Sequence, residues 1–244
     1  MSKNNKIFGA KLVLEYLQSG KSITKIWLSK TINQRVQEIE DLARKRKIPF
    51  SRLEKKELSK ILGPEQNKSV VAEVSPVKIH DEKFLYENKL DTAKYLFAVN
   101  IEDPHNLGAM IRSVHAFGLD GIIFSNRNTS TLSDFVIRAS AGAIFETNLI
   151  RVGNISNCIK KLKENNFWVY GTDVKSENSA SIYETKFDQK SVILLGNEGK
   201  GLSPNVKKPC DFVIHIPCSF NSLNVSVATG IILSSVYQQN LMND

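Results

Sequence analysis

Two short apolar segments, each followed by a polar loop, constrain the fold of this chain more than any other feature. The segments are residues 192–195 and 212–216, and both are rich in β-branched residues and about as long as a strand. The loops 196–201 and 217–221 follow them, and a helix-like run of small and apolar residues then extends to about Asn240. Open α/β sheets bind ligands in a crevice at the carboxyl ends of their strands. The stretch therefore predicts a backbone-lined crevice that holds a small cofactor.

Strands and helices alternate along the whole chain. In the first third we expect helices at 9–20, 32–47 and 54–62 and strands at 23–29, 48–53 and 69–74. Further on we expect strands at 95–101, 121–125 and 167–172 and helices at 108–117, 132–143 and 155–165. Such alternation predicts an α/β fold, with a largely parallel sheet that carries helices on both faces in the later part.

A polar segment without sustained periodicity separates the two parts. Residues 76–93 indicate a linker or a short helical connector. We therefore predict a first domain at 1–75, a linker at 76–93 and a second domain at 94–244.

The excess of positive over negative charge lies entirely in the first domain. Residues 1–75 contain 16 Lys and Arg against 8 Asp and Glu, whereas the remaining residues contain 17 of each kind. Such asymmetry favours contact with a polyanion, of which nucleic acid is the usual one. The alternative interpretation is a solvated surface that is merely rich in lysine.

Several classes of protein are disfavoured by motifs that the sequence does not contain. No apolar run approaches the roughly 18 residues of a membrane span, and the first residues lack the apolar core of a secretion signal. The three cysteines form no C-x-x-C and the four histidines no H-E-x-x-H, so we expect neither a disulfide frame nor a metal site. No G-x-G-x-x-G follows a strand, and Leu202 stands where a P-loop would have its lysine. We expect a soluble, cytoplasmic protein.

The first of three polar clusters spans residues 100–112, at a predicted strand-to-helix turn. Asn106 stands where a helix N-cap would be, and capping alone is one interpretation of it. Arg112 lies about one and a half turns into the helix among apolar neighbours. It is either a surface charge or a guanidinium directed at a phosphate.

The other two clusters follow the two segments described first. Three glycines within 196–201 would let a ligand approach the backbone around Asn197 and Glu198, and the alternative is a plain turn. Ser222 could merely cap the last helix, but Asn224 in its first turn is harder to explain as a cap.

Together the three clusters resemble the SpoU/TrmH family, within the SPOUT superfamily, of S-adenosylmethionine-dependent RNA ribose 2′-O-methyltransferases. The family's three motifs match N-x-x-x-P-x-N-x-G-x-x-x-R at 100–112, L-L-G-N-E-G-x-G-L at 194–202, and I-P at 216–217 followed by S-L-N-V-S-V-A at 222–228. Residues 7–28 also resemble the start of the RNA-binding domain of the bacterial large-subunit rRNA guanosine-2′-O-methyltransferases, a domain similar to ribosomal protein L30e. The resemblance thus covers essentially the full chain.

The resemblance implies an L30e-like RNA substrate-binding domain, a SPOUT α/β methyltransferase domain with a C-terminal trefoil knot, and a homodimer. It implies methyl transfer from S-adenosylmethionine to a ribose 2′-hydroxyl, by this subfamily a guanosine of 23S rRNA. The implied cofactor-binding residues are Gly196, Asn197, Gly201, Ile216 and Leu223. The implied catalytic residues are Arg112, Asn106, Glu198, Ser222 and Asn224.

Three alternatives stay open on the sequence alone. The first is a tRNA ribose 2′-O-methyltransferase, and the second is a resistance-type rRNA methyltransferase with a different target nucleotide. The third is a non-catalytic rRNA-binding assembly protein that has the same fold without the cofactor.

Overall fold

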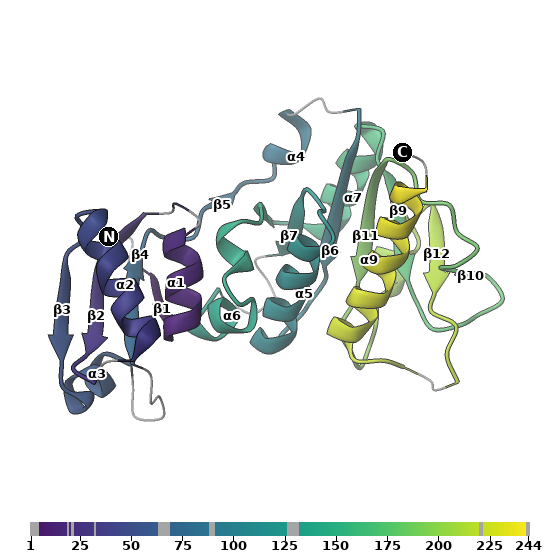
Figure 1. Ribbon diagram of the computed structural model, residues 1–244. Coiled ribbons are helices and arrows are strands. Elements are labelled where there is room, and N and C mark those ends of the chain that lie inside the picture. Colours follow the sequence, from purple (N-terminus) through teal and green to yellow (C-terminus); the bar gives the residue numbers. More distant parts are fainter. Residues whose placement is uncertain are drawn as a thin grey trace. The chain divides into compact units, whose positions relative to one another are not determined.

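The chain of 244 residues divides into two compact units, Met1–Val77 and Lys78–Asp244. The computed structural model in Figure 1 describes residues 5–18, 20, 22–31, 33–62, 69–87, 91–125, 132–219 and 222–242. The last two residues of the predicted loop 217–221 lie outside the described residues. Each unit is described by itself below.

In its described residues, the first unit is a four-stranded mixed sheet with three helices. Its strands, in the order of the sheet, are β1 (Asn5–Phe8), β4 (Val70–Val74), β2 (Ile23–Ser29) and β3 (Phe50–Leu53), and its helices are α1 (Ala10–Gln18), α2 (Gln34–Lys45) and α3 (Lys55–Leu62). Strand β4 pairs antiparallel with both β1 and β2, whereas β3 pairs parallel with β2. The predicted helices and strands of residues 9–74 are all present, with ends shifted by a few residues.

Alternating side chains give the first sheet two different faces. Ile26 and Leu28 of β2 are fully buried, and the residue between them, Trp27, points to the opposite face. There it packs beside a small cluster that includes Leu58 of α3 and Val71 of β4. Helix α3 therefore contributes to a second, smaller core beneath part of that face.

The second unit is built on an eight-stranded sheet in which every pairing is parallel. The strands, in sheet order, are β10 (Ala180–Ser181), β12 (Phe212–His215), β9 (Trp168–Thr172), β11 (Lys190–Leu195), β6 (Ala93–Ala98), β7 (Gly121–Ser125), β8 (Leu149–Val152) and β5 (Ile79–His80). The helices are α4 (Phe84–Glu87), α5 (Pro104–Ala116), α6 (Asp134–Ala139), α7 (Ile155–Glu164), α8 (Pro204–Lys207) and α9 (Val225–Leu241), with a 3₁₀ turn η1 at Ala143–Phe145. The predicted parallel α/β architecture is confirmed.

Helices cover both faces of this sheet, as Figure 1 shows for α5 and α9 on one face and α7 on the other. All six residues of the central strand β6 are buried, which is typical of a strand covered on both sides. Tyr95 and Phe97 of β6 belong to the core that includes Ile159 and Leu162 of α7. Leu96, which lies between them in sequence, is also buried and by the alternation of a strand points to the opposite face of the sheet.

Short elements were the ones that the sequence patterns did not reveal. Residues 76–93, predicted to form a linker or a short helical connector, contain α4 and also β5, which pairs with β8 as an edge strand of the large sheet. Strands β5 and β10 have two residues each, too few to show an alternation. The predicted helix 132–143 is shorter: it ends at Ala139, and the chain turns at Ala141 and Gly142, which have φ angles of 50° and 90°.

The order of the strands places the site. The chain fills one side of β6 with β7 and β8, and then crosses to the other side, where β11 lies between β6 and β9. Such a reversal leaves a crevice at the carboxyl ends of the strands, and ligands of open parallel sheets bind in this crevice. Strand β11 lies directly beside the reversal, and the ends of β9 and β12 follow it along the same edge of the sheet. The trefoil knot stays a prediction.

Candidate active site

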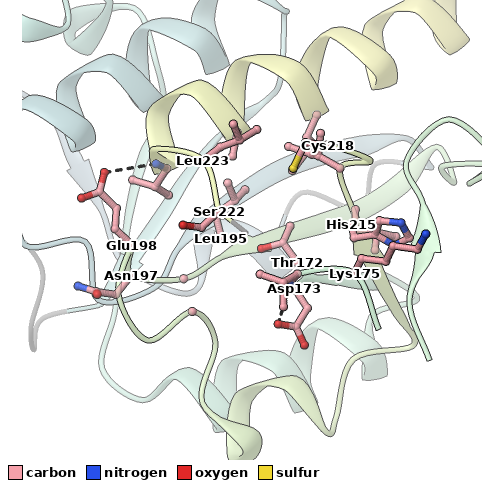
Figure 2. A pocket seen from close by; sticks show the side chains of 18 of the residues that line it. Thr172, Asp173, Lys175, Leu195, Asn197, Glu198, His215, Cys218, Ser222 and Leu223 are labelled. Atoms are coloured by element: carbon pink, nitrogen blue, oxygen red, sulfur yellow. Dashed lines mark hydrogen bonds between the residues drawn. The ribbon is translucent and has the colours of Figure 1, made fainter. Parts of the chain in front are cut away.

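A cavity of about 580 Å³ opens at the carboxyl ends of β9, β11 and β12 and is bordered by the start of α9. Figure 2 shows Asn197 and Glu198 at one end of it, His215 and Lys175 at the other, and Ser222 between. Its volume lies within the roughly 300–1,000 Å³ of small-molecule sites. All five predicted cofactor-binding residues line it: Gly196, Asn197, Gly201, Ile216 and Leu223.

The glycine loop after β11 is a tight turn in which two backbone segments touch. A Cβ on Gly196 would lie 2.2 Å from the carbonyl carbon of Gly201, so only glycine fits. The N–H of Gly201 donates to the carbonyl of Asn197 at 2.8 Å, and Gly201 has a φ of 60°. Gly199 differs, because a Cβ there would meet only the Asn197 Oδ1 at an ordinary 3.6 Å. The loop lines the cavity, and its tight conformation depends on Gly196, whose backbone packs directly against that of Gly201.

Asn197 connects two of the predicted clusters. Its Nδ2 donates to the carbonyl of Asn100 at 3.3 Å, and its Oδ1 accepts from the N–H of Gly199 at 2.9 Å. Asn100 has a φ of 56°, a left-handed conformation that asparagine tolerates better than most residues. The loops after β6 and β11 are therefore held together by a side-chain amide.

Three polar residues from three different motifs form one hydrogen-bond network. Asn106 Nδ2 donates to Glu198 Oε1 at 2.9 Å, and Asn224 Nδ2 donates to Asn106 Oδ1 at 3.1 Å. Asn224 Nδ2 also donates to the same Glu198 oxygen, as does the backbone N–H of Val225 at 3.4 Å. The partial positive charge at the start of α9 favours a carboxylate there. Donors from two helices thus converge on one carboxylate oxygen.

The interpretations of Asn106 and Ser222 as helix caps were wrong, and so was the expectation that Asn224 lies within the first turn of the last helix and is not its cap. Asn106 does not cap α5, because Asp103 does so by accepting from the N–H of His105 at 2.9 Å, with Pro104 at the first helical position. Ser222 does not cap α9. Asn224 does, because its Oδ1 accepts from the N–H groups of Ser226 and Val227. Asn106 and Asn224 are therefore placed by helix starts, and their amide groups are directed to each other.

The predicted catalytic residues do not all meet. The structure brings together Asn106, Glu198 and Asn224, while Ser222 is exposed and lines the cavity. Arg112 is exposed on α5 and does not line the cavity. It follows Asn106 by six residues, which is a rotation of about 240° on a helix, so it leaves α5 from a different face.

Several polar residues of the cavity were not predicted as site residues, and three of them have hydrogen-bond or ion-pair partners on neighbouring elements. Thr172 Oγ1 donates to the carbonyl of Leu194 at 2.9 Å, Asp173 pairs with Lys207 of α8, and the buried His215 lies with its Nδ1 3.0 Å from Ser179 Oγ. Two of them follow or end β9, and the third ends β12. The rule that ligands bind at the carboxyl ends of neighbouring strands was the signal that would have found them.

Apolar side chains form the rest of the wall. The cavity is lined at its apolar side by Leu195, Ile214, Ile216, Leu223, Val225, Ala228 and Ile232. Together with the glycine backbone and the polar residues, this arrangement fits a ligand that has a flat apolar ring and several polar groups.

The described part of the chain contains neither a cluster of metal-binding side chains nor a membrane-spanning helix. Among those residues, no group of three or more His, Cys, Asp or Glu side chains is placed to hold a metal ion. Within the same ranges, no helix is long and apolar enough to cross a membrane.

Comparisons with known proteins agree with this geometry. Residues 93–234 match the SpoU rRNA methylase family, and residues 6–80 match a model described as RNA 2′-O ribose methyltransferase substrate binding. The chain is 36% identical over 241 residues to a Staphylococcus aureus protein and 32% identical over 239 residues to Bacillus subtilis YacO, and in both cases 96% of this chain and 95% of the relative are covered. Both relatives have names that place them among TrmH family tRNA/rRNA methyltransferases.

Solved structures show the same fold at lower identity. AviRb, a SpoU methyltransferase from Streptomyces viridochromogenes in complex with AdoMet, superimposes with a TM-score of 0.76 at 22% identity, covering 97% of this chain and 90% of that one. An AdoMet-bound rRNA methyltransferase from Sinorhizobium meliloti gives 0.76 at 22% identity, covering 98% and 88%.

The fold and the site define a methyltransferase of the SPOUT class. This chain belongs to the SpoU/TrmH family of RNA methyltransferases. The cofactor of that family is S-adenosylmethionine.

Proposed function

We propose that this protein transfers the methyl group of S-adenosylmethionine to the ribose 2′-hydroxyl of a guanosine in 23S rRNA. The observation that carries the proposal is the polar network of Asn106, Glu198 and Asn224 at the edge of a glycine-lined cavity. These groups could form hydrogen bonds with a ribose while the adjoining cavity held a small cofactor. The protein would act in the cytoplasm, where bacteria such as those of the relatives make their rRNA.

The residues of the cavity fit S-adenosylmethionine. Its adenine ring suits the apolar wall, and its amino, carboxylate and ribose groups suit exposed backbone N–H and C=O groups of the loop that Gly196 keeps narrow. Gly196, Asn197, Gly201, Ile216 and Leu223 would hold it. When bound, this cofactor supplies a methyl group that is already activated on a sulfonium.

The chain's own residues would then mainly supply position and charge. Holding two reactants in line can lower the activation free energy of a reaction by roughly 7–11 kcal/mol. We assign Arg112 to the phosphate beside the target ribose, since a guanidinium binds phosphate through paired hydrogen bonds. An arginine stays protonated at neutral pH, so Arg112 would stabilise negative charge on the 2′-oxygen and not remove its proton as a base. Ser222, Asn224, Asn106 and Glu198 would orient the ribose.

We assign RNA binding to the first unit, which carries the charge excess. Trp27 is only partly buried, and the ammonium groups of Lys6 and Lys25 lie 6.0 and 5.3 Å from its ring centroid. Aromatic rings flanked by cations suit RNA, because bases stack on the ring while the cations bind the backbone. This surface, Lys6–Lys25–Trp27, lies on the sheet face that α3 covers only in part.

We also propose a homodimer, built on the last helix. Apolar and small residues occur on all faces of α9, a pattern expected of a helix that is buried all round. Val227, Tyr237 and Leu241 nevertheless remain 50%, 43% and 61% exposed in the single chain. A second copy that covers this helix would bury them.

A labelling experiment tests the reaction and the substrate together. The purified protein is incubated with tritiated S-adenosylmethionine and separate pools of rRNA and tRNA that lack ribose methylation, and the label is mapped. Label on a guanosine 2′-oxygen of 23S rRNA is the expected result. Label on tRNA would keep the reaction and overturn the substrate. No label, together with no cofactor binding in calorimetry, would instead favour the non-catalytic RNA-binding protein.

A further inference from the structure

An exposed aromatic residue lies beside the polar network without a role in the function proposed above. Phe135 of α6 is 52% exposed, so it contributes little to the core. The guanidinium carbon of Arg138 lies 4.6 Å from its ring centroid, and the ring of His105 meets it edge-on at 6.4 Å. Three flat groups, two of them able to carry positive charge, therefore gather at one surface point, which we call the Phe135 platform.

The packing of α6 on α5 fixes this platform close to the site. A Cβ on Gly108 of α5 would lie 2.4 Å from the Cβ of Ala139 and 2.9 Å from the carbonyl of Val136, so the two helices touch through their backbones. His105 is the residue immediately before Asn106, and its own N–H is held by Asp103. The platform thus begins one residue from the side chain that donates to Glu198.

The chemistry of the platform suits a nucleobase more than a protein partner. Unpaired bases in RNA complexes stack on aromatic side chains and on arginine planes. The Phe135 ring already holds a guanidinium over one face, which pre-orients a group that also binds phosphate. A protein-binding patch would instead need several contiguous apolar side chains. The three residues here are one apolar ring and two polar ones.

We propose that the Phe135 platform stacks an unpaired RNA base next to the target nucleotide and so positions the ribose at the cavity. The proposal rests on the RNA methyltransferase function proposed above and adds a substrate-positioning surface to it. Stacking accepts any base, so the platform fixes the position of the strand without selecting its sequence. A misplaced ribose reacts slowly, because methyl transfer needs the reacting atoms in line.

The test compares Phe135→Ala with Phe135→Tyr and with the control Tyr183→Ala, a residue of the same unit that is 66% exposed. The substrate is an RNA fragment that contains the mapped target, with 2-aminopurine at each neighbouring position in turn. We expect Phe135→Ala to lower kcat/KM for RNA by roughly 5- to 100-fold, the range of a lost base stack, with cofactor affinity unchanged. Phe135→Tyr and Tyr183→Ala should stay within about twofold of the wild type, since neither removes a stacking ring from the platform.

Fluorescence of the probe separates stacking from a structural role. Quenching of 2-aminopurine at one neighbouring position by the wild type, absent in Phe135→Ala, is the expected result. Wild-type kinetics in Phe135→Ala would overturn the platform and leave the methyltransferase function standing. A loss of cofactor binding in that variant would overturn it as well, because the residue would then act through the fold. A wild type that labels no RNA would instead refute the function itself.

Discussion

The first unit holds the buried carboxylate of Glu40 by ion pairs, whereas the second unit holds the carboxylate of its site by amide hydrogen bonds. Glu40 of α2 is 5% exposed and accepts from Arg44 at 2.7 Å and from Arg52. Glu198 is exposed and accepts from the neutral side chains of Asn106 and Asn224. Charge attracts over several ångströms with little dependence on direction, whereas amide hydrogen bonds fix direction.

The difference fits two separate tasks. A unit with a net positive charge can bind a polyanion over a range of geometries, while a unit with equal numbers of acidic and basic residues can hold reacting groups in one geometry. If this division is correct, substitutions in the second unit change turnover or cofactor binding. Substitutions in the first unit change RNA affinity and its dependence on salt.

The largest effect is expected at Arg112. Arg112→Ala should lower kcat by roughly a thousandfold or more, because it removes the cation assigned to the developing oxyanion. Cofactor affinity in calorimetry should not change, since Arg112 does not line the cavity. Arg112→Lys keeps the charge but not the paired geometry, so it should rescue only in part. Lys160→Ala, at an exposed position on α7, is the matched control. Wild-type turnover in Arg112→Ala would refute the role of this residue.

The next effect is expected in the glycine loop. Gly196→Ala should weaken cofactor binding by roughly a hundredfold, because the new Cβ would overlap the backbone of Gly201 and force the loop to rebuild. Gly199→Ala is the control, since its Cβ has room. Calorimetry with S-adenosylmethionine measures both, and thermal unfolding checks that each variant is folded. Equal affinities in two folded variants would show that the loop does not hold the cofactor.

A smaller effect is expected on RNA affinity and its dependence on salt, which should change with substitutions in the first unit only. The double change Lys6→Gln with Lys25→Gln should weaken RNA binding by about tenfold and reduce the slope of log affinity against log salt by about 1.4, as expected for two lost contacts to single-stranded RNA. The same double change at Lys160 and Lys163 of the second unit should leave the slope unchanged. Binding titrations at several salt concentrations measure it. Equal slopes for the two double variants would break the division of tasks.

Removing the charge of the ion-paired carboxylate, Glu40, should lower the stability of the first unit. Hydrogen bonding from Arg44 lowers the pKa of Glu40 below its ordinary value, and Arg52 adds to the effect. The ion pairs of Glu40 therefore stabilise the folded protein fully at a pH above the pKa that Glu40 has in the unfolded chain. This stabilisation is lost as the pH falls through the lower pKa that Glu40 has in the folded protein. Glu40→Gln should lower the free energy of unfolding by about 1–2 kcal/mol at pH 7, a modest value because Arg44 is largely exposed and its pairing is screened.

The pH dependence gives this prediction its control. The difference between wild type and Glu40→Gln should shrink toward acid pH, where the wild-type carboxyl is protonated as well. Glu15→Gln removes an exposed pair with Lys11 and should cost less than about 0.5 kcal/mol at any pH. Urea unfolding followed by Trp27 fluorescence, in a Trp168→Phe background, reports the first unit. A difference that stays constant with pH would mean that Glu40 acts by packing alone.

The smallest effect concerns a thiol at the cavity. Burial raises the pKa of Cys158 to about 12 and that of Cys210 to about 11, so neither thiol should react near pH 8. Cys218 is exposed and lines the cavity, and a thiol reagent should modify it first. S-adenosylmethionine should slow that modification severalfold by covering it, which mass spectrometry of the labelled peptide measures. An unchanged rate at a saturating concentration would place the cofactor elsewhere.

The sequence by itself determined the fold class and most of the cavity. The five residues predicted to hold the cofactor line it, because each lies in a loop between the end of a strand and the start of the next helix, at the carboxyl edge of the sheet. Strand and helix periods in long elements were also sufficient, since burial on one or two faces sets them. Two-residue strands such as β5 carry no period, and the sequence could not show them.

Only the tertiary structure decided which polar residues meet. Asn106 and Glu198 are 92 positions apart, and they bond because β11 lies beside β6, a neighbour relation that no local pattern encodes. The start of α5 then sets the direction of the Asn106 side chain. Asp103 caps this helix, so the amide oxygen of Asn106 is left to accept from Asn224. Likewise Phe135 reaches His105 only because Gly108 lets α6 touch α5. Propensities act over a few residues, whereas the site depends on the order of strands in the sheet and on contact between helix backbones.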